Sequence, residues 1–97
     1  MSFIKPIIFI GDKMNKSQFA YTLDICLGNE KIAIERFLKK YVKNEKELKQ
    51  LFKLCQANGL IDNNLKYSYE NLINGLANYK NAEEFLLKPY DDLIFFE

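Results

Sequence analysis

Apolar residues recur along most of this chain with the 3.6-residue period of an α-helix, and asparagine or glycine separates one such segment from the next. An apolar residue at every third or fourth position gives a helix one face to bury. Four helices are predicted on this ground, so the chain is expected to be mainly α. Their apolar positions are Phe19, Ala20, Leu23, Cys26 and Leu27; Ile34, Phe37, Leu38, Tyr41 and Val42; Leu48, Leu51, Phe52 and Cys55; and Leu65, Tyr69, Leu72, Ile73 and Leu76.

Capping residues indicate where these helices begin and end. A side chain that accepts a hydrogen bond from the first turn favours a helix start, and a left-handed glycine favours a helix end. Two of the expected caps are followed three residues later by Gln18 and Glu47, which is the spacing of a capping box. The expected N-terminal caps are Asn15, Asn29 and Asn44, and the glycines expected to follow a helix are Gly28 and Gly59. The second helix is expected over about residues 30–43.

The terminal segments differ from the middle of the chain. Asn81 and Glu84 have the spacing of a capping box and predict a fifth short helix, which Pro89 should end. The runs IKPIIFI and DDLIFFE are short and apolar, and two isolated strands are marginal in water. A ribbon formed from them must therefore lie on the helices. We expect one domain over residues 1–97, a compact bundle of four to five short helices with or without this two-stranded β ribbon.

The chain lacks the residues on which most enzymatic chemistry depends. It has no histidine, so the commonest general base, the usual catalytic triad and most zinc sites lose their central residue. Its four glycines are isolated, which argues against a glycine-rich phosphate loop. We therefore expect no enzymatic activity, no metal site and no cofactor.

The two cysteines and the lengths of the apolar runs indicate the cellular compartment of the protein. Cys26 and Cys55 both fall on apolar helix faces, which favours buried, reduced thiols in a cytosolic protein over a disulfide. The longest apolar runs have four residues, whereas a membrane-spanning helix needs about 20. A cytoplasmic protein that does not bind membranes is therefore expected.

Charge is unevenly distributed, although the net charge is only +1. Residues 30–55 hold eight Lys or Arg and four Glu, whereas residues 56–97 hold three Lys and seven Asp or Glu. The basic side chains predicted to share the outer faces of two helices are Arg36, Lys39, Lys40, Lys43, Lys46 and Lys49. A solvated helix surface is one interpretation of this basic face, and a surface for an acidic protein or for nucleic acid is the other. The opposite charges of the two halves also permit a homodimer.

Residues 51–72 have part of the spacing of a DNA-binding helix-turn-helix. Cys55 stands four residues before Gly59, Leu60 follows the glycine, and Leu65 lies six residues after it. Ser68, however, occupies the next position at which an apolar residue is expected. Because any corner between two packed helices can use a glycine followed by an apolar residue, an ordinary structural corner is the preferred interpretation.

Base recognition is also poorly supported by the residues after this corner. The single arginine, Arg36, lies outside the segment, and arginine makes the commonest contact to guanine. Asp62 and Glu70 would face phosphates unfavourably. A helix-turn-helix-like DNA-binding regulator is therefore the alternative function.

The C-terminal residues form a second candidate surface. Large apolar residues at a chain end are expected to be buried, either on the protein's own helices or in a partner. The residues assigned to partner binding are Tyr90, Asp91, Asp92, Phe95 and Phe96. The sequence thus predicts a small cytosolic binding protein that acts on another protein, of the inhibitor, antitoxin, immunity or adaptor type.

Overall fold

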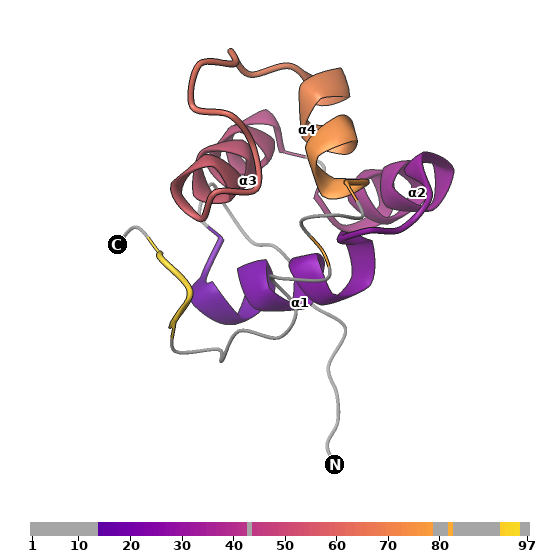
Figure 1. The fold of residues 1–97 in the computed structure, drawn as a ribbon. Helices are drawn as coiled ribbons and strands as arrows, with labels where there is room; N and C mark the ends of the chain where they lie inside the picture. The colour runs from indigo at the N-terminus through magenta and orange to yellow at the C-terminus, as the bar shows by residue number, and fades with distance from the viewer. Residues whose placement is uncertain (1–13, 43, 79–81, 83–91, 96–97) are drawn as a thin grey trace.

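Four helices make up most of the described structure. The computed structural model describes residues 14–42, 44–78, 82 and 92–95. Its helices are α1 (Lys16–Cys26), α2 (Lys31–Tyr41), α3 (Glu45–Ala57) and α4 (Tyr69–Leu76). α2 and α3 lie on opposite sides of the molecule, with α4 above and α1 below the gap between them (Figure 1). The predicted mainly α bundle of short helices is confirmed.

Two predictions concern terminal segments that are largely undescribed. The fifth helix, expected from Asn81 to near Lys88, lies outside the described residues except for Ala82. The N-terminal half of the predicted ribbon also lies outside them. Among the described residues there is no strand, and residues 93–95 have no regular secondary structure.

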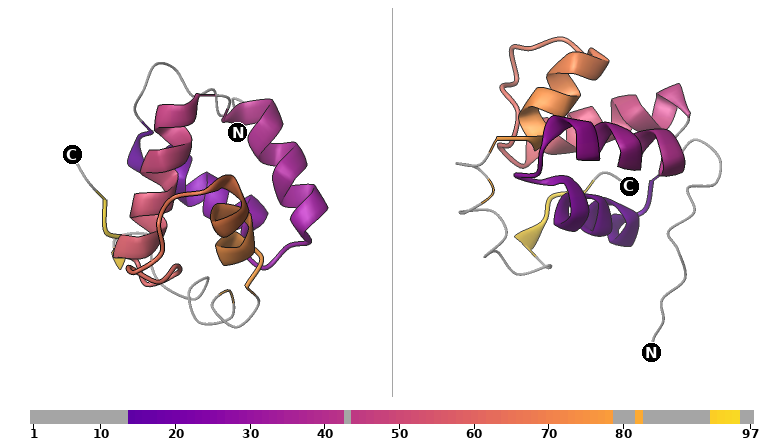
Figure 2. Two further views of the ribbon diagram at one scale, coloured as in Figure 1. Left: turned by 90° about the horizontal axis from the view of Figure 1, so that it is seen from above. Right: turned by 90° about the vertical axis from the view of Figure 1, so that its right-hand side faces the viewer.

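The core lies where the apolar faces of all four helices converge. Its completely buried side chains include Phe19, Leu38, Leu51, Leu54, Cys55, Leu72 and Leu76. Burial of a large apolar side chain contributes about 1.5–3 kcal/mol, so this shared core is the main source of stability. Viewed from above, α4 lies between α2 and α3, so that it covers one end of the core (Figure 2).

Both predicted ends of α1 are confirmed. Asn15 and Gln18 form a capping box, in which each side chain accepts a 2.8 Å hydrogen bond from the backbone N–H of the other residue. At the C-terminal end, Gly28 has a φ of 79°, which glycine adopts without steric penalty. The Gly28 N–H donates to the carbonyl oxygen of Leu76 at 2.6 Å, so this corner is fixed to the end of α4.

The start of α2 differs from its prediction by one residue. Glu30, rather than Asn29, is the N-cap, and the helix extends over Lys31–Tyr41 rather than to residue 43. The Asn29 side chain instead connects two helices, because its Nδ2 donates to Ile25 in α1 at 3.2 Å while its Oδ1 accepts from the Glu30 N–H at 2.8 Å. The side chain of an asparagine between two close helix ends can bond to either helix. The sequence alone does not show which helix it bonds to.

The ends of α3 are as predicted. Asn44 is the N-cap, and its side chain accepts a hydrogen bond from the Lys46 N–H at 2.7 Å. At the other end, Gly59 has a φ of 79°. The Gly59 N–H donates to Gln56 at 3.1 Å and the Leu60 N–H donates to Cys55 at 2.8 Å, which together form a Schellman motif.

The connection from α3 to α4 is longer than a helix-turn-helix turn. Residues 58–68 separate the two helices, whereas the motif uses a turn of about three or four residues. The helix predicted to include Leu65 begins only at Tyr69, and Leu65 is 45% exposed, so its placement on the helical face is wrong. Ser68 caps α4 by accepting from the Asn71 N–H at 3.0 Å, which explains a polar residue at this position.

Hydrogen bonds from α3 hold this connection in its non-helical path. The Gln56 Nε2 donates to the carbonyl oxygens of Asp62 and Leu65, both at 3.0 Å. The Asp62 side chain accepts from the Asn64 N–H at 2.8 Å, which forms a local turn. Residues 58–68 therefore lie against α3 as a defined loop.

Candidate binding site

The predicted basic residues are exposed on two helices. Lys43 lies outside the described residues. The other five, hereafter the basic surface, are all exposed and are Arg36, Lys39 and Lys40 on α2 and Lys46 and Lys49 on α3. Because α2 and α3 lie on opposite sides of α4, the basic surface consists of two groups, one on each of these two helices (Figure 2).

Two of these lysines lie near aromatic rings. The Lys40 Nζ is 5.2 Å from the centroid of the Tyr41 ring, and the Lys49 Nζ is 6.0 Å from that of Tyr67. A cation over an aromatic face is attracted by the ring quadrupole, by about 0.5–1 kcal/mol at exposed sites. These contacts favour side-chain positions in which the two ammonium groups stay close to the helix surface.

The C-terminal candidate residues are only partly described. Tyr90, Asp91 and Phe96 lie outside the described residues. Asp92 is exposed, whereas Phe95 is half-buried and packs against the protein's own core.

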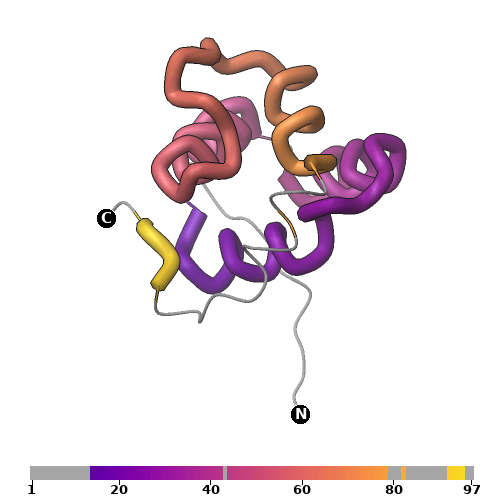
Figure 3. Tube along the Cα trace, in the orientation of Figure 1, coloured from indigo at the N-terminus to yellow at the C-terminus, as the bar shows by residue number. Residues whose placement is uncertain are grey.

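Residues 92–95 are held next to the C-terminal end of α3 (Figure 3). The Asn58 side chain pairs with the backbone of Ile94, its Nδ2 donating to the carbonyl oxygen and its Oδ1 accepting from the N–H, both at 2.9 Å. The side chain of Leu93 packs against the core, while that of Ile94 is 52% exposed. In this arrangement Asp92 and Ile94 are the residues of the segment that a partner could contact.

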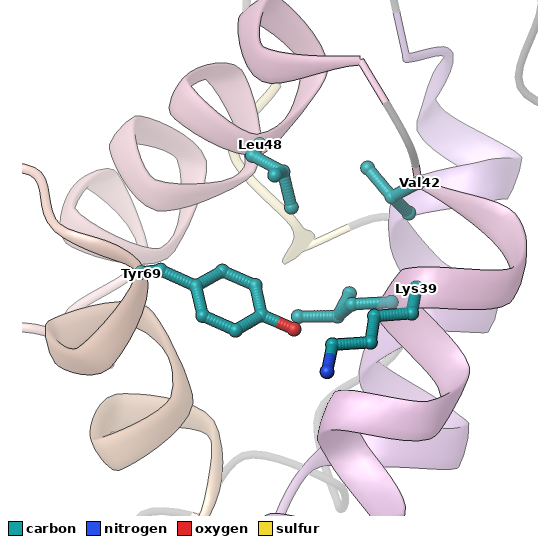
Figure 4. A pocket seen from close by; sticks show the side chains of 5 residues that line it. Lys39, Val42, Leu48 and Tyr69 are labelled. Atoms are coloured by element: carbon teal, nitrogen blue, oxygen red, sulfur yellow. The ribbon is translucent and has the colours of Figure 1, made fainter.

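A pocket lies where α2, α3 and α4 approach one another. Its volume is about 360 Å³. It is lined by Leu38, Lys39, Val42, Leu48 and Tyr69. The Tyr69 ring extends from the start of α4 toward α2, with Leu48 and Val42 on one side of it and Lys39 on the other (Figure 4). The pocket thus combines apolar walls with one cation and one phenol.

The Tyr69 hydroxyl is the least satisfied group of this pocket. Its oxygen is buried and has no hydrogen-bond partner among the described residues. Burial raises the pKa of Tyr69, and the charges of Glu35 and then Cys26 raise it further. The group is therefore a neutral hydroxyl at physiological pH, able to donate one hydrogen bond.

A second pocket, of about 460 Å³, is also lined by Tyr69. It differs from the first in that most of its lining is polar or charged. It is lined by Lys31, Glu35, Tyr69, Glu70, Ile73 and Asn74. The two glutamates make this second pocket unfavourable for an anion.

Tyr67, two residues before Tyr69, has a hydrogen-bond partner for its hydroxyl. Its hydroxyl donates to the Glu45 carboxylate at 3.2 Å, and its ring meets that of Phe52 edge-on with centroids 5.5 Å apart. Burial, the charge of Glu45, the hydrogen bond to it and the charge of Tyr69 raise the pKa of Tyr67 to about 12. Tyr67 therefore fixes the loop onto α3, whereas Tyr69 leaves a hydroxyl unused.

The described residues offer little for covalent or metal chemistry. Cys26 and Cys55 are buried free thiols. Burial raises the pKa of Cys26 to about 12, and burial together with the charge of Cys26 raises that of Cys55 further, so both remain protonated at neutral pH. In the described part of the chain, no group of three or more His, Cys, Asp or Glu could hold a metal ion. No helix there is long and apolar enough to span a membrane.

Comparisons with protein-family models, with curated proteins and with solved structures found no match for this chain. Its function is therefore inferred from its own residues.

The pocket at Tyr69 is the feature that sequence reasoning missed. Tyr69 was assigned to the apolar face of a helix, which is correct for its ring but not for its hydroxyl. The available signal was Ser68, a strong N-cap residue that places Tyr69 in the first turn of a helix, next to the preceding loop. The spacing of residues in the sequence does not indicate that Lys39 and Leu48 lie next to this tyrosine.

Proposed function

We propose that this chain is a small, non-enzymatic binding protein that holds an acidic protein partner through its basic surface. The observation that carries the proposal is the exposure of all five described members of that surface, three on α2 and two on α3. Clustered positive charge raises the rate at which an oppositely charged partner associates. An inhibitor, antitoxin, immunity or adaptor role in the cytosol fits this type of binding.

The distribution of acidic residues supports a protein partner over duplex DNA. α4 lies between α2 and α3 and carries the exposed Glu70, and the loop that precedes α4 carries the exposed Asp62 (Figure 2). A duplex laid across both groups would bring its phosphates close to these carboxylates, which would repel them. A protein partner, unlike a duplex, can carry acidic residues opposite the lysines and none opposite Glu70 and Asp62.

Affinity purification from the source cells at low salt tests the proposal. The wild-type chain is expected to recover a protein whose contact surface is acidic. The double variant Arg36→Glu, Lys40→Glu removes cations from α2 without touching the pocket lining, and it should recover at least about tenfold less of that protein. The control Lys16→Glu, Lys66→Glu has the same change in net charge outside the basic surface and should recover the wild-type amount.

The same purified protein distinguishes two other possible partners, duplex DNA and a second copy of this chain. Salt-sensitive binding to random duplex DNA, abolished by Arg36→Glu with Lys40→Glu, would replace the proposal with a nucleic-acid function. Sedimentation of the pure chain at low salt as a dimer, with no recovered protein, would replace it with self-association. Equal recovery of a partner by both double variants would contradict the role of the basic surface.

A further inference from the structure

The pocket between α2, α3 and α4 contains an unused hydrogen-bond donor. The Tyr69 hydroxyl is buried and has no partner among the described residues, and Figure 4 shows the tyrosine ring extending across the pocket toward Lys39. Buried polar groups in folded proteins nearly always have a hydrogen-bond partner. A buried donor at the wall of a pocket is therefore a contact for a group that enters from outside.

Tyr67 shows which group this donor is suited to. The Tyr67 hydroxyl donates to the carboxylate of Glu45, and the ammonium group of Lys49 lies 6.0 Å from the same ring. At Tyr69 the phenol and a lysine, Lys39, line one pocket, but no carboxylate is among its lining residues. Tyr69 and Lys39 thus resemble Tyr67 and Lys49, but no carboxylate takes the place of Glu45.

Charge decides which of the two pockets at Tyr69 favours an anion. Glu35 and Glu70 line the second pocket, together with Lys31, and the charge of Glu35 acts on the phenol. In the first pocket, Lys39 is the charged residue of the lining. An anion is therefore favoured in the first pocket, where Lys39 can pair with it, and disfavoured in the second.

The other residues that line the pocket determine which kind of group must be attached to the anion. Leu38, Val42 and Leu48 are apolar and contribute the other walls. The volume of about 360 Å³ is at the lower end of the range of about 300–1,000 Å³ typical of ligand pockets. It suits one acidic side chain with an apolar neighbour better than a large cofactor.

From these observations we infer that the pocket at Tyr69 binds a carboxylate attached to an apolar group, with the Tyr69 hydroxyl and the Lys39 ammonium group as donors. The occupant is an aspartate or glutamate side chain of the protein partner, flanked by an aliphatic residue. This assignment rests on the proposed function for the source of the carboxylate. The pocket itself can be tested on the isolated chain without any partner.

The test is an NMR titration of the isotopically labelled chain with N-acetyl-Leu-Glu-amide, and separately with N-acetyl-Leu-Gln-amide. The glutamate peptide should shift the amide resonances of residues 38–42, Leu48 and Tyr69 in a saturable manner. The glutamine peptide has the same shape without the charge and should bind at least about fivefold more weakly. Equal affinity for the two peptides would overturn the inference.

Matched variants identify the donors. Tyr69→Phe and Lys39→Gln should each weaken binding of the glutamate peptide by about threefold to tenfold. Tyr67→Phe and Lys66→Gln make the same chemical changes outside the pocket and outside the basic surface, and they should leave the affinity unchanged. Undiminished binding to Tyr69→Phe would overturn the inference, as would binding that every variant weakens equally.

A third titration tests the source of the carboxylate. Hexanoate carries the same group on a free aliphatic chain, and binding at least tenfold tighter than that of the peptide would assign the pocket to a small aliphatic acid instead. Failure of all titrations while Arg36→Glu with Lys40→Glu still abolishes partner recovery would reject the pocket and retain the proposed function. Peptide binding without a recoverable partner would reject the proposed function, and with it the protein source of the carboxylate, but would retain the pocket.

Discussion

At the residue scale, Tyr67 and Tyr69 show how two like side chains acquire different roles. The Tyr67 hydroxyl has a carboxylate partner in Glu45, while the buried Tyr69 hydroxyl has none among the described residues. The ring of each packs partly buried against the core. The apolar contribution of Tyr69 was predictable from the helical period, but the fate of each hydroxyl depends on which helix approaches it.

Tyr69→Phe is expected to raise the free energy of unfolding by about 1 kcal/mol, because it removes a buried hydroxyl whose lack of a partner costs about 1–3 kcal/mol. Urea denaturation measures this change. Tyr67→Phe removes a hydroxyl that has a partner and should lower the same quantity by about 0.5–1 kcal/mol. A decrease for Tyr69→Phe would mean that its hydroxyl is satisfied in the folded protein.

Gly75 shows a packing requirement inside a helix. A Cβ built at this position would lie 2.7 Å from the Cδ1 of Ile61 and closer still to its Cγ1. Glycine at this position is less favourable than alanine by about 1 kcal/mol in helix propensity, which the sequence already indicates. The structure shows that the missing side chain lets the buried Ile61 of the loop approach α4.

Gly75→Ala should therefore lower the free energy of unfolding by about 1–2 kcal/mol, since overpacking outweighs the gain in helix propensity. In a chain that already carries Ile61→Ala, the same substitution should raise stability by about 1 kcal/mol, because the obstruction is gone. Urea denaturation of the four chains measures this reversal of sign. Additive effects of the two substitutions would contradict the close approach.

The raised pKa values predict a loss of stability at high pH. The pKa of Cys26 rises from 9.0 to about 12 on folding, and that of Tyr67 rises from 10.0 to about 12. Between these values the unfolded chain has released protons that the folded chain still holds, so unfolding becomes more favourable as the pH rises. This contribution is complete below about pH 9 and is lost toward pH 12.

Urea midpoints measured from pH 7.5 to 11 should be constant up to about pH 8.5 and then decrease. Tyr67→Phe should show a shallower decrease above pH 10, because one of the titrating groups is missing. A midpoint that stays constant to pH 11 would mean that these groups titrate alike in the folded and unfolded chains.

At the scale of elements, helix starts and ends were predictable where one capping interaction dominates. The Asn15–Gln18 box and the glycines at positions 28 and 59 belong to this class. The start of α2 and that of α4 were misplaced, because Asn29 bonds to the preceding helix and Gln56 holds the loop that contains Leu65. Both errors arise from contacts between elements, which a local pattern does not contain.

The C-terminal segment depends on Asn58, the C-cap of α3. Asn58→Asp keeps the size of the side chain but loses the Nδ2 donor to Ile94 and to Leu54, and it places a negative charge at a helix C-terminus. The amide of Ile94, which donates to Asn58 Oδ1, should exchange with solvent at least tenfold faster, while the amides in the middle of α3 keep their protection. Hydrogen exchange followed by NMR measures both.

Asn64→Asp is the control for this variant, because it makes the same change of charge in the same loop at an exposed position. It should leave the exchange rate at Ile94 unchanged. Equal acceleration in both variants would show that charge, rather than the pairing with Asn58, controls the segment.

At the scale of the whole molecule, the exposure of the described basic residues was predictable from the sequence and the pocket was not. The basic residues follow the helical period, so their exposure on α2 and α3 could be predicted from their spacing. The pocket requires Leu38, Leu48 and Tyr69 from three helices to meet, and nothing in their sequence positions encodes this approach. The basic surface and the pocket together suggest a protein that recognises acidic groups.

The association rate of the recovered partner, measured as a function of salt concentration, tests this account most directly. For the wild-type chain the rate should fall steeply between about 20 and 500 mM salt, because screening shortens the range of the attraction. For Arg36→Glu with Lys40→Glu it should be at least about tenfold lower at low salt and nearly independent of salt. Rates that are the same for both chains and unaffected by salt would contradict it.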